Sequence, residues 1–197
     1  MPLLLIALPA LVAPAPTPPA PPTMDQLQDQ LKAVPEAFIK GKASAMPGLV
    51  AKATEGWNRA KPGLGKVVPE AEATAIDRQL KAMKGMQPRE QAVGALGVSN
   101  LLSRFQPRAR SQDLLQADRS TMMAWCVVDA GQLDRLPGVE AAFKPLIDKD
   151  QGQHTVAVVA VQDALKRLQA SQQKRQAAGM KKALRDLLDL VDVLEKP

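Results

Sequence analysis

A short run of sulfur-bearing side chains is where this sequence comes closest to a metal site. Met122, Met123 and Cys126 lie close together in the chain. On a helix, spacings of three and four residues place Cys126 on the same face as either methionine. Thioether and thiolate ligands of this kind select Cu(I). Methionine also fills irregular gaps in apolar cores, and Trp125 lies within the run, so we interpret the three residues as core and keep them as weak metal candidates.

His154 is the only histidine of the chain and therefore limits every histidine-based site. It could act as a base toward Cys126, or bind haem iron together with a methionine. A di-iron bundle needs Glu-x-x-His on two helices and a c-type haem needs Cys-x-x-Cys-His, and the sequence contains neither pattern. We interpret His154 as a surface residue and Cys126 as a buried, unreactive thiol. The sequence thus predicts a protein that is not an enzyme and has no cofactor.

Three aspartates lie near the C-terminus: Asp186, Asp189 and Asp192. Carboxylates of this kind could bind a cation. A spacing of three residues drifts around a helix, so the three carboxylates do not share one line along its surface. Lys182 and Arg185 lie among them and would compete with a bound cation. We therefore expect a solvated helix face here.

The net charge of +6 raises the question of an anionic partner. Basic residues gather in two groups: Arg104, Arg108 and Arg110, and Lys174, Arg175, Lys181 and Lys182. Proteins that bind single-stranded nucleic acid also stack bases on aromatic side chains. This chain has no tyrosine and only 3% aromatic residues, so we expect no nucleic-acid binding. An unknown protein or an anionic surface of the cell envelope is the expected partner.

Apolar residues that recur every three or four positions predict helices throughout residues 24–197. Two stripes near the C-terminus are the clearest: Val158, Val161, Leu165 and Leu168, then Leu184, Leu187, Val191 and Leu194. The polar segment 171–179 separates them and predicts an antiparallel helical hairpin. Thr155–Val161 is rich in valine and would also suit a strand, but a lone strand would have no partner, so a helix is favoured. Pro35 is expected to kink or split the first helix.

The composition agrees with an all-α fold. Apolar residues make up 46% of the chain, and with so few aromatics the core must consist of Leu, Val, Ala and Met, which favour helices. Cys126 is the only cysteine, which rules out an internal disulfide. We predict one domain over residues 24–197: a bundle of four or more core helices that ends in the antiparallel hairpin.

Residues 1–23 carry no charge. Leu3–Ala13 has the length of the apolar core of a secretory signal and is too short to span a membrane. The Pro/Ala-rich stretch that follows is expected to be a disordered, extended spacer. No basic residue precedes the apolar run, and prolines follow the alanines at which cleavage would occur. Export to the periplasm or the medium is the prediction, and a cytoplasmic protein with an apolar tail is the alternative.

Together these observations predict an exported, non-enzymatic helical bundle that binds a partner or a surface through its helix faces. It would have no transmembrane helix and would be a monomer or a homodimer. The alternative is a ligand-binding bundle of the cell envelope that holds haem, copper or a small apolar molecule. The sequence does not name the partner or the ligand.

Overall fold

A computed structural model describes residues 21–105, 111–134, 136, 138–149, 152 and 155–195. Within these residues the chain forms eight α-helices, two short 3-10 turns and no strand, which confirms the predicted all-α bundle. The helices are α1 (Met24–Ile39), α2 (Met46–Leu64), α3 (Glu70–Met83), α4 (Pro88–Leu102), α5 (Gln112–Asp129), α6 (Val139–Lys149), α7 (Thr155–Gln173) and α8 (Ala177–Leu194). The 3-10 turns are η1 (Ala43–Ala45) and η2 (Ser103–Phe105).

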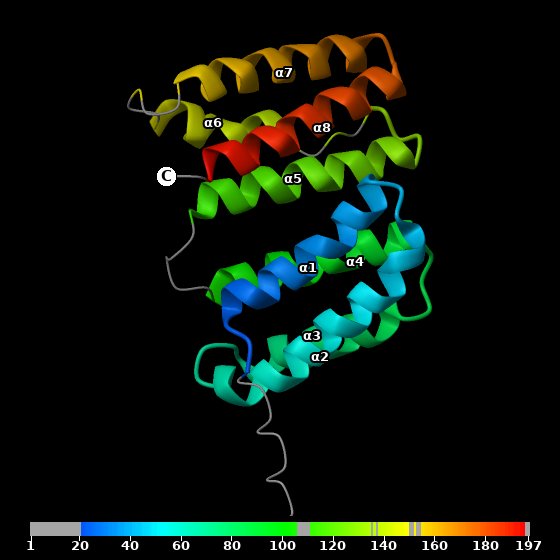
Figure 1. Ribbon diagram of the computed structural model, residues 1–197, viewed down its shortest axis with the longest axis vertical. Coiled ribbons are helices and arrows are strands. Elements are labelled where there is room, and N and C mark those ends of the chain that lie inside the picture. The colour runs from blue at the N-terminus through cyan, green and yellow to red at the C-terminus, as the bar shows by residue number, and fades with distance from the viewer. Residues whose placement is uncertain are drawn as a thin grey trace, which may run out of the picture.

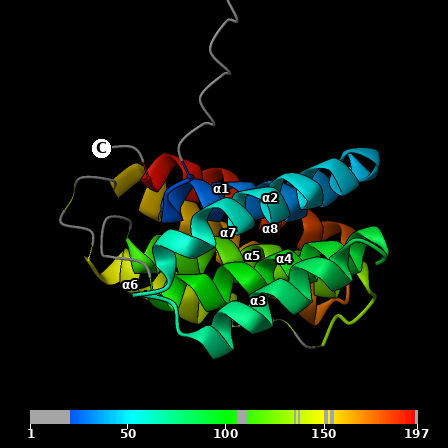
Figure 2. The same cartoon turned by 90° about the horizontal axis from the view of Figure 1, so that it is seen from below.

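The helices stack in layers along the long axis of the molecule (Figure 1). Helices α2 and α3 lie at one end, α1 and α4 come next, α5 follows, and α6, α7 and α8 lie at the other end. The view from below shows α1 and α2 on one side of the N-terminal half and α3 and α4 on the other (Figure 2). We refer to α1–α4 as the N-terminal half and to α5–α8 as the C-terminal half.

Each half has its own apolar core. The first core includes the buried side chains Leu27, Val50, Trp57, Ile76 and Leu80, and the second includes Phe143, Val161, Met180, Leu184 and Leu187. Helix α5 contributes to both, because it packs against α4 and α1 on one side and α6 and α8 on the other. The expectation of a single domain stays a prediction.

Local sequence explains where several helices begin. Thr23 caps α1: its hydroxyl accepts a hydrogen bond from the Gln26 backbone N–H, and the Gln26 side chain accepts one from the Thr23 N–H. The Ser111 hydroxyl caps α5 in the same way by accepting from the Leu114 N–H. Pro35 lies inside α1, which continues to Ile39, so the expected split is wrong. The proline lacks one backbone donor, but its ring is buried, and this packing offsets the loss.

The C-terminal hairpin forms as predicted. Helices α7 and α8 pack along each other, and the turn between them contains Arg175 in the left-handed conformation, with φ of 52°. The Gln176 N–H donates to the Ser171 carbonyl and closes the turn. The valine-rich segment Thr155–Val161 is helical, as favoured. Among the described residues, no helix is long and apolar enough to cross a membrane.

Polar side chains cross the contact between the two halves. Arg119 on α5 donates through Nη1 to the Ser99 carbonyl at 3.1 Å and to Ser103 Oγ at 2.7 Å. Arg185 on α8 donates through Nη2 to the Ile39 carbonyl at 3.3 Å. Contacts between units that depend on polar groups permit relative movement more readily than large apolar contacts. The most buried of these polar contacts forms the candidate site.

Candidate functional site

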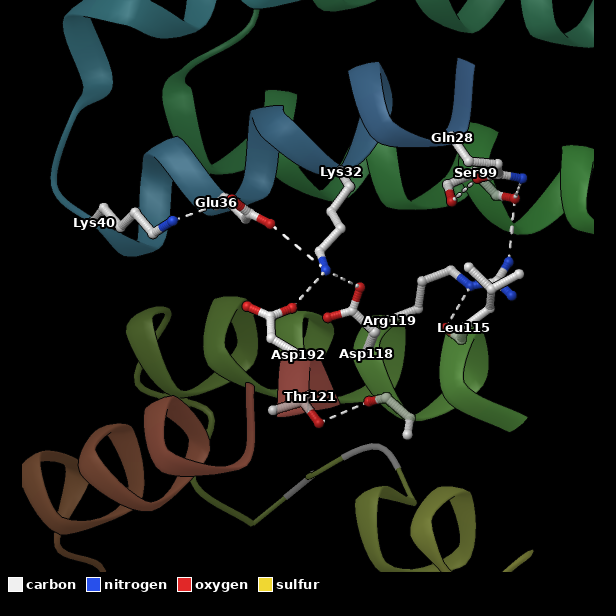
Figure 3. Close-up of polar contacts among 11 residues, drawn as sticks. Gln28, Lys32, Glu36, Lys40, Ser99, Leu115, Asp118, Arg119, Thr121 and Asp192 are labelled. Atoms are coloured by element: carbon white, nitrogen blue, oxygen red, sulfur yellow. Dashed lines mark hydrogen bonds and ion pairs between the residues drawn. The ribbon is translucent and has the colours of Figure 1, made fainter. Parts of the chain in front are cut away.

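Lys32 is the centre of an ion-pair network between α1, α5 and α8 (Figure 3). Its Nζ lies 3.1 Å from Asp118 Oδ2 and 3.3 Å from Asp192 Oδ1. It also lies 3.7 Å from Oε1 of Glu36, one turn further along α1. The other oxygen of Glu36 pairs with Lys40 at 3.1 Å. One ammonium group thus holds three carboxylates from three helices.

Asp118 is the most buried member of the network. Only 9% of its side chain is exposed, against 61% for Asp192. Its Oδ2 pairs with Lys32, whereas its Oδ1 has no hydrogen-bond partner among the described residues. Figure 3 shows this second oxygen on the side facing Asp192. A buried acceptor without a donor costs about 1–3 kcal/mol, so an added donor at this atom would be favourable.

A cavity of about 100 Å³ lies beside the network, and Asp118 forms part of its wall. Ile39, Met122 and Leu188 supply the apolar part of the wall. A dry cavity of about 150 Å³ is sufficient for benzene, so this one accepts a molecule of only a few heavy atoms. It is too small for a haem.

Burial and neighbouring charges together shift the pKa values of Asp118 and Lys32. Burial raises the pKa of the Asp118 carboxyl, and the neighbouring Asp192 and Glu36 carboxylates raise it further, although Lys32 opposes them. Burial disfavours the Lys32 ammonium, but the three carboxylates outweigh burial and raise the pKa of Lys32 as well. The rise in the pKa of Lys32 therefore reflects its carboxylate partners, whereas the rise in the pKa of Asp118 comes first from burial.

Hydrogen bonds beside the network fix the helix that carries Asp118. Arg119 Nε donates to the Leu115 carbonyl at 2.9 Å, in addition to its contacts with α4 and η2. The Ser99 hydroxyl donates to Gln28 Oε1 at 2.5 Å, and Gln28 Nε2 donates to the Ser99 carbonyl at 3.1 Å. These contacts join α1, α4 and α5. They hold Asp118 in place opposite Lys32.

The structure describes three of the four residues that the sequence suggested as weak metal candidates. Met122 is buried in the second core and also lines the cavity, and Met123 is half-buried against the same core. Cys126 is buried in the first core. His154 lies outside the described residues. Among the residues that the structure does describe, no group of three or more His, Cys, Asp or Glu side chains could hold a metal ion.

We expect the Cys126 thiol to react slowly while the protein is folded. Burial, together with the Asp129 carboxylate, raises the pKa of Cys126 to about 12, against the smaller opposing effect of Arg89. At pH 8 almost no thiolate is present, and the sulfur is covered. We predict at least ~100-fold slower modification by an aromatic disulfide reagent in buffer than in guanidinium chloride. Rapid stoichiometric reaction of the native protein would contradict the burial of this residue.

The acidic series on α8 is only partly a solvated face. Asp186 pairs with Arg167 on α7 at 2.5 Å, Asp192 pairs with Lys32, and Asp189 lines the cavity. Sequence analysis did not identify Lys32 or Asp118. Asp118 did carry a signal, because it lies at a buried position of α5, where an ionisable side chain needs a partner. That signal does not reveal which residue the partner is.

The comparisons with known proteins supply no further assignment. No protein-family model, curated protein or solved structure matches this chain. The site is therefore interpreted from its own geometry and charge.

Proposed function

We propose that this protein is a non-enzymatic binding protein that holds a small molecule in the cavity between α1, α5 and α8. The observation that carries the proposal is the cavity itself, whose wall includes Asp118, a buried carboxylate with one oxygen that has no hydrogen-bond partner among the described residues. Ligand sites commonly combine an apolar wall with a few polar groups and lie between structural units. Here the apolar wall comes from Ile39, Met122 and Leu188, and seven charged side chains, Asp118 among them, complete the lining.

The state of Lys32 supports binding rather than catalysis. A lysine that acts as a base or a nucleophile must lose its proton near neutral pH. The carboxylates around Lys32 raise its pKa, so its ammonium form persists. Lys32 thus orients Asp118 in the wall of the cavity.

Fragment binding followed by amide NMR tests the proposal. We expect a set of small polar and apolar molecules to yield at least one ligand, with shifts concentrated on α1, α5 and α8 around the cavity. Leu188→Phe adds volume to the cavity wall at a half-buried position and should weaken binding at least about tenfold. Val156→Ala, at a side chain that is 86% exposed on α7, is the matched control and should bind normally. Shifts that lie elsewhere, or no ligand at all, would refute the proposal.

Export and a protein or envelope partner stay predictions from the sequence. The outer face of α7 is suited to such a partner, because Val156 is 86% exposed and Val159, about one turn further along, is 51% exposed. Sedimentation of the purified protein over a range of concentrations tests the homodimer. Sequencing the N-terminus of the protein from cells tests export.

A further inference from the structure

We infer that one end of the helical bundle docks on an anionic phospholipid surface. At this end α1, α3, α5 and α7 finish and α2, α4 and α8 begin, on the right-hand side of Figure 1. We call it the basic end and define it as residues 36–46, 81–90, 129–134 and 174–182. This surface does not require a ligand in the cavity between α1, α5 and α8.

Tertiary contacts bring the four segments of the basic end together. Gln91 on α4 donates through Nε2 to the Met83 carbonyl at 2.9 Å, which joins the start of α4 to the end of α3. Helix α4 packs against α5, and Lys181 on α8 pairs with Asp129 at the end of α5 at 2.6 Å. Arg185, further along α8, donates to the last carbonyl of α1. Segments that lie far apart in the chain thus form one end of the molecule.

The two ends of the bundle carry opposite charge. The basic end has four Asp and Glu residues against nine Lys and Arg residues: Lys40, Lys42, Lys81, Lys84, Arg89, Lys174, Arg175, Lys181 and Lys182. The described residues of the opposite end have four Lys and Arg against nine Asp and Glu, over 24–30, 61–72, 102–105, 111–113, 147–149 and 189–195. This separation of charge would orient the protein with its basic end toward an anionic surface.

Partners within the fold account for only some of these cations. Lys40, Arg175 and Lys181 pair with carboxylates. In the part of the chain that the structure describes, the other six have no ion-pair partner. The helix dipole stabilises Lys81 in the last turn of α3, but it disfavours Arg89 in the first turn of α4. Most of the positive charge therefore stays available to an external anion.

An exposed apolar side chain lies among the unpaired cations and favours a lipid surface. Met86 is 38% exposed and lies in the loop between α3 and α4, after Lys84 and before Arg89. Surfaces that lie on membranes combine apolar side chains at the headgroup boundary with Lys and Arg that attract anionic lipids. Each Lys or Arg close to such a membrane strengthens binding about fivefold.

A nucleic acid fits this surface less well. Single strands are bound by stacking bases on aromatic side chains. All the aromatic side chains of this protein are buried or half-buried: Phe38, Trp57, Phe105, Trp125 and Phe143. None of them offers a face for stacking at the basic end.

Cosedimentation of the full chain with lipid vesicles tests the inference. We expect binding to vesicles of equal parts phosphatidylglycerol and phosphatidylcholine at low ionic strength, loss of binding at high ionic strength, and no binding to phosphatidylcholine alone. The triple variant Lys84→Gln/Arg89→Gln/Lys182→Gln should weaken binding at least about tenfold. The matched control Lys66→Gln/Arg104→Gln/Lys144→Gln removes the same charge from exposed positions outside the basic end and should bind within about twofold of the native protein.

Met86→Gln tests the contact with the bilayer itself. It keeps the charge of the basic end and should weaken binding to the anionic vesicles severalfold, because the apolar contact is lost. Val93→Gln is the matched control, since Val93 is 39% exposed on α4 outside the basic end and should bind normally. Circular dichroism of all the variants should match that of the native protein.

Four results would overturn the inference. These are no binding to the anionic vesicles, equal binding to phosphatidylcholine alone, equal losses for the two triple variants, and no effect of Met86→Gln. A short DNA duplex that binds more tightly than the anionic vesicles at the same ionic strength would assign the basic end to nucleic acid instead.

Discussion

Lys32→Met is expected to destabilise the folded protein by about 3 kcal/mol, because it leaves the Asp118 carboxylate buried without its partner. Removing one member of a buried ion pair costs about 3–5 kcal/mol. The Lys32 side chain is 19% exposed, which places the effect at the lower end. Methionine retains most of the apolar stem, so the loss reports the charge rather than the packing.

Urea denaturation followed by circular dichroism measures this effect. Lys166→Met is the matched control, because the Lys166–Asp163 pair on α7 is exposed on both sides and should contribute less than about 0.5 kcal/mol. The double variant Lys32→Met/Asp118→Leu removes both charges and should recover most of the stability. Equal free energies of unfolding for Lys32→Met and Lys166→Met would show that the Lys32–Asp118 pair contributes nothing to stability.

The pH dependence of Lys32→Met follows from the raised pKa of Asp118. A carboxyl whose pKa is higher in the folded than in the unfolded state binds more protons when folded, so stability falls as pH rises through that range. Removing Lys32 raises the folded pKa further, since Lys32 opposes the shift in the native protein. The Glu36 and Asp192 carboxylates face the same group. The loss of unfolding free energy that Lys32→Met causes should therefore be smaller at pH 4 than at pH 7.

Phe143→Ala should destabilise the protein by about 3–5 kcal/mol, the usual cost of truncating a buried phenylalanine. Phe143 on α6 is fully buried in the second core. Loss of its ring leaves a cavity that the surrounding Leu and Val side chains fill only in part. Urea denaturation measures the change, and Val156→Ala, within about 0.5 kcal/mol of the native protein, is the control. A loss below 1 kcal/mol would mean that α6 does not share the cooperative core.

The helices themselves could be predicted from the sequence. Apolar stripes such as Leu184, Leu187 and Val191 report which face of a helix is buried, and that information is local. The polar segment between the last two stripes predicted the hairpin for the same reason. The expected split at Pro35 was wrong because a local rule, the missing backbone donor, was offset by burial of the ring in the folded protein, and the kink stays a prediction.

The sequence by itself determined that the chain is helical, that its last two helices form a hairpin, and that Cys126 is buried. Only the tertiary structure decided that Lys32, Asp118 and Asp192 meet, since they come from α1, α5 and α8, which lie far apart in the chain. Helical periodicity states which way a side chain faces, but it carries no information about which other helix lies opposite. The role of Asp118 depends on which helix lies opposite α5. The sequence shows only an aspartate at a buried position of a helix, whereas the structure shows that it pairs with Lys32 and lines a cavity.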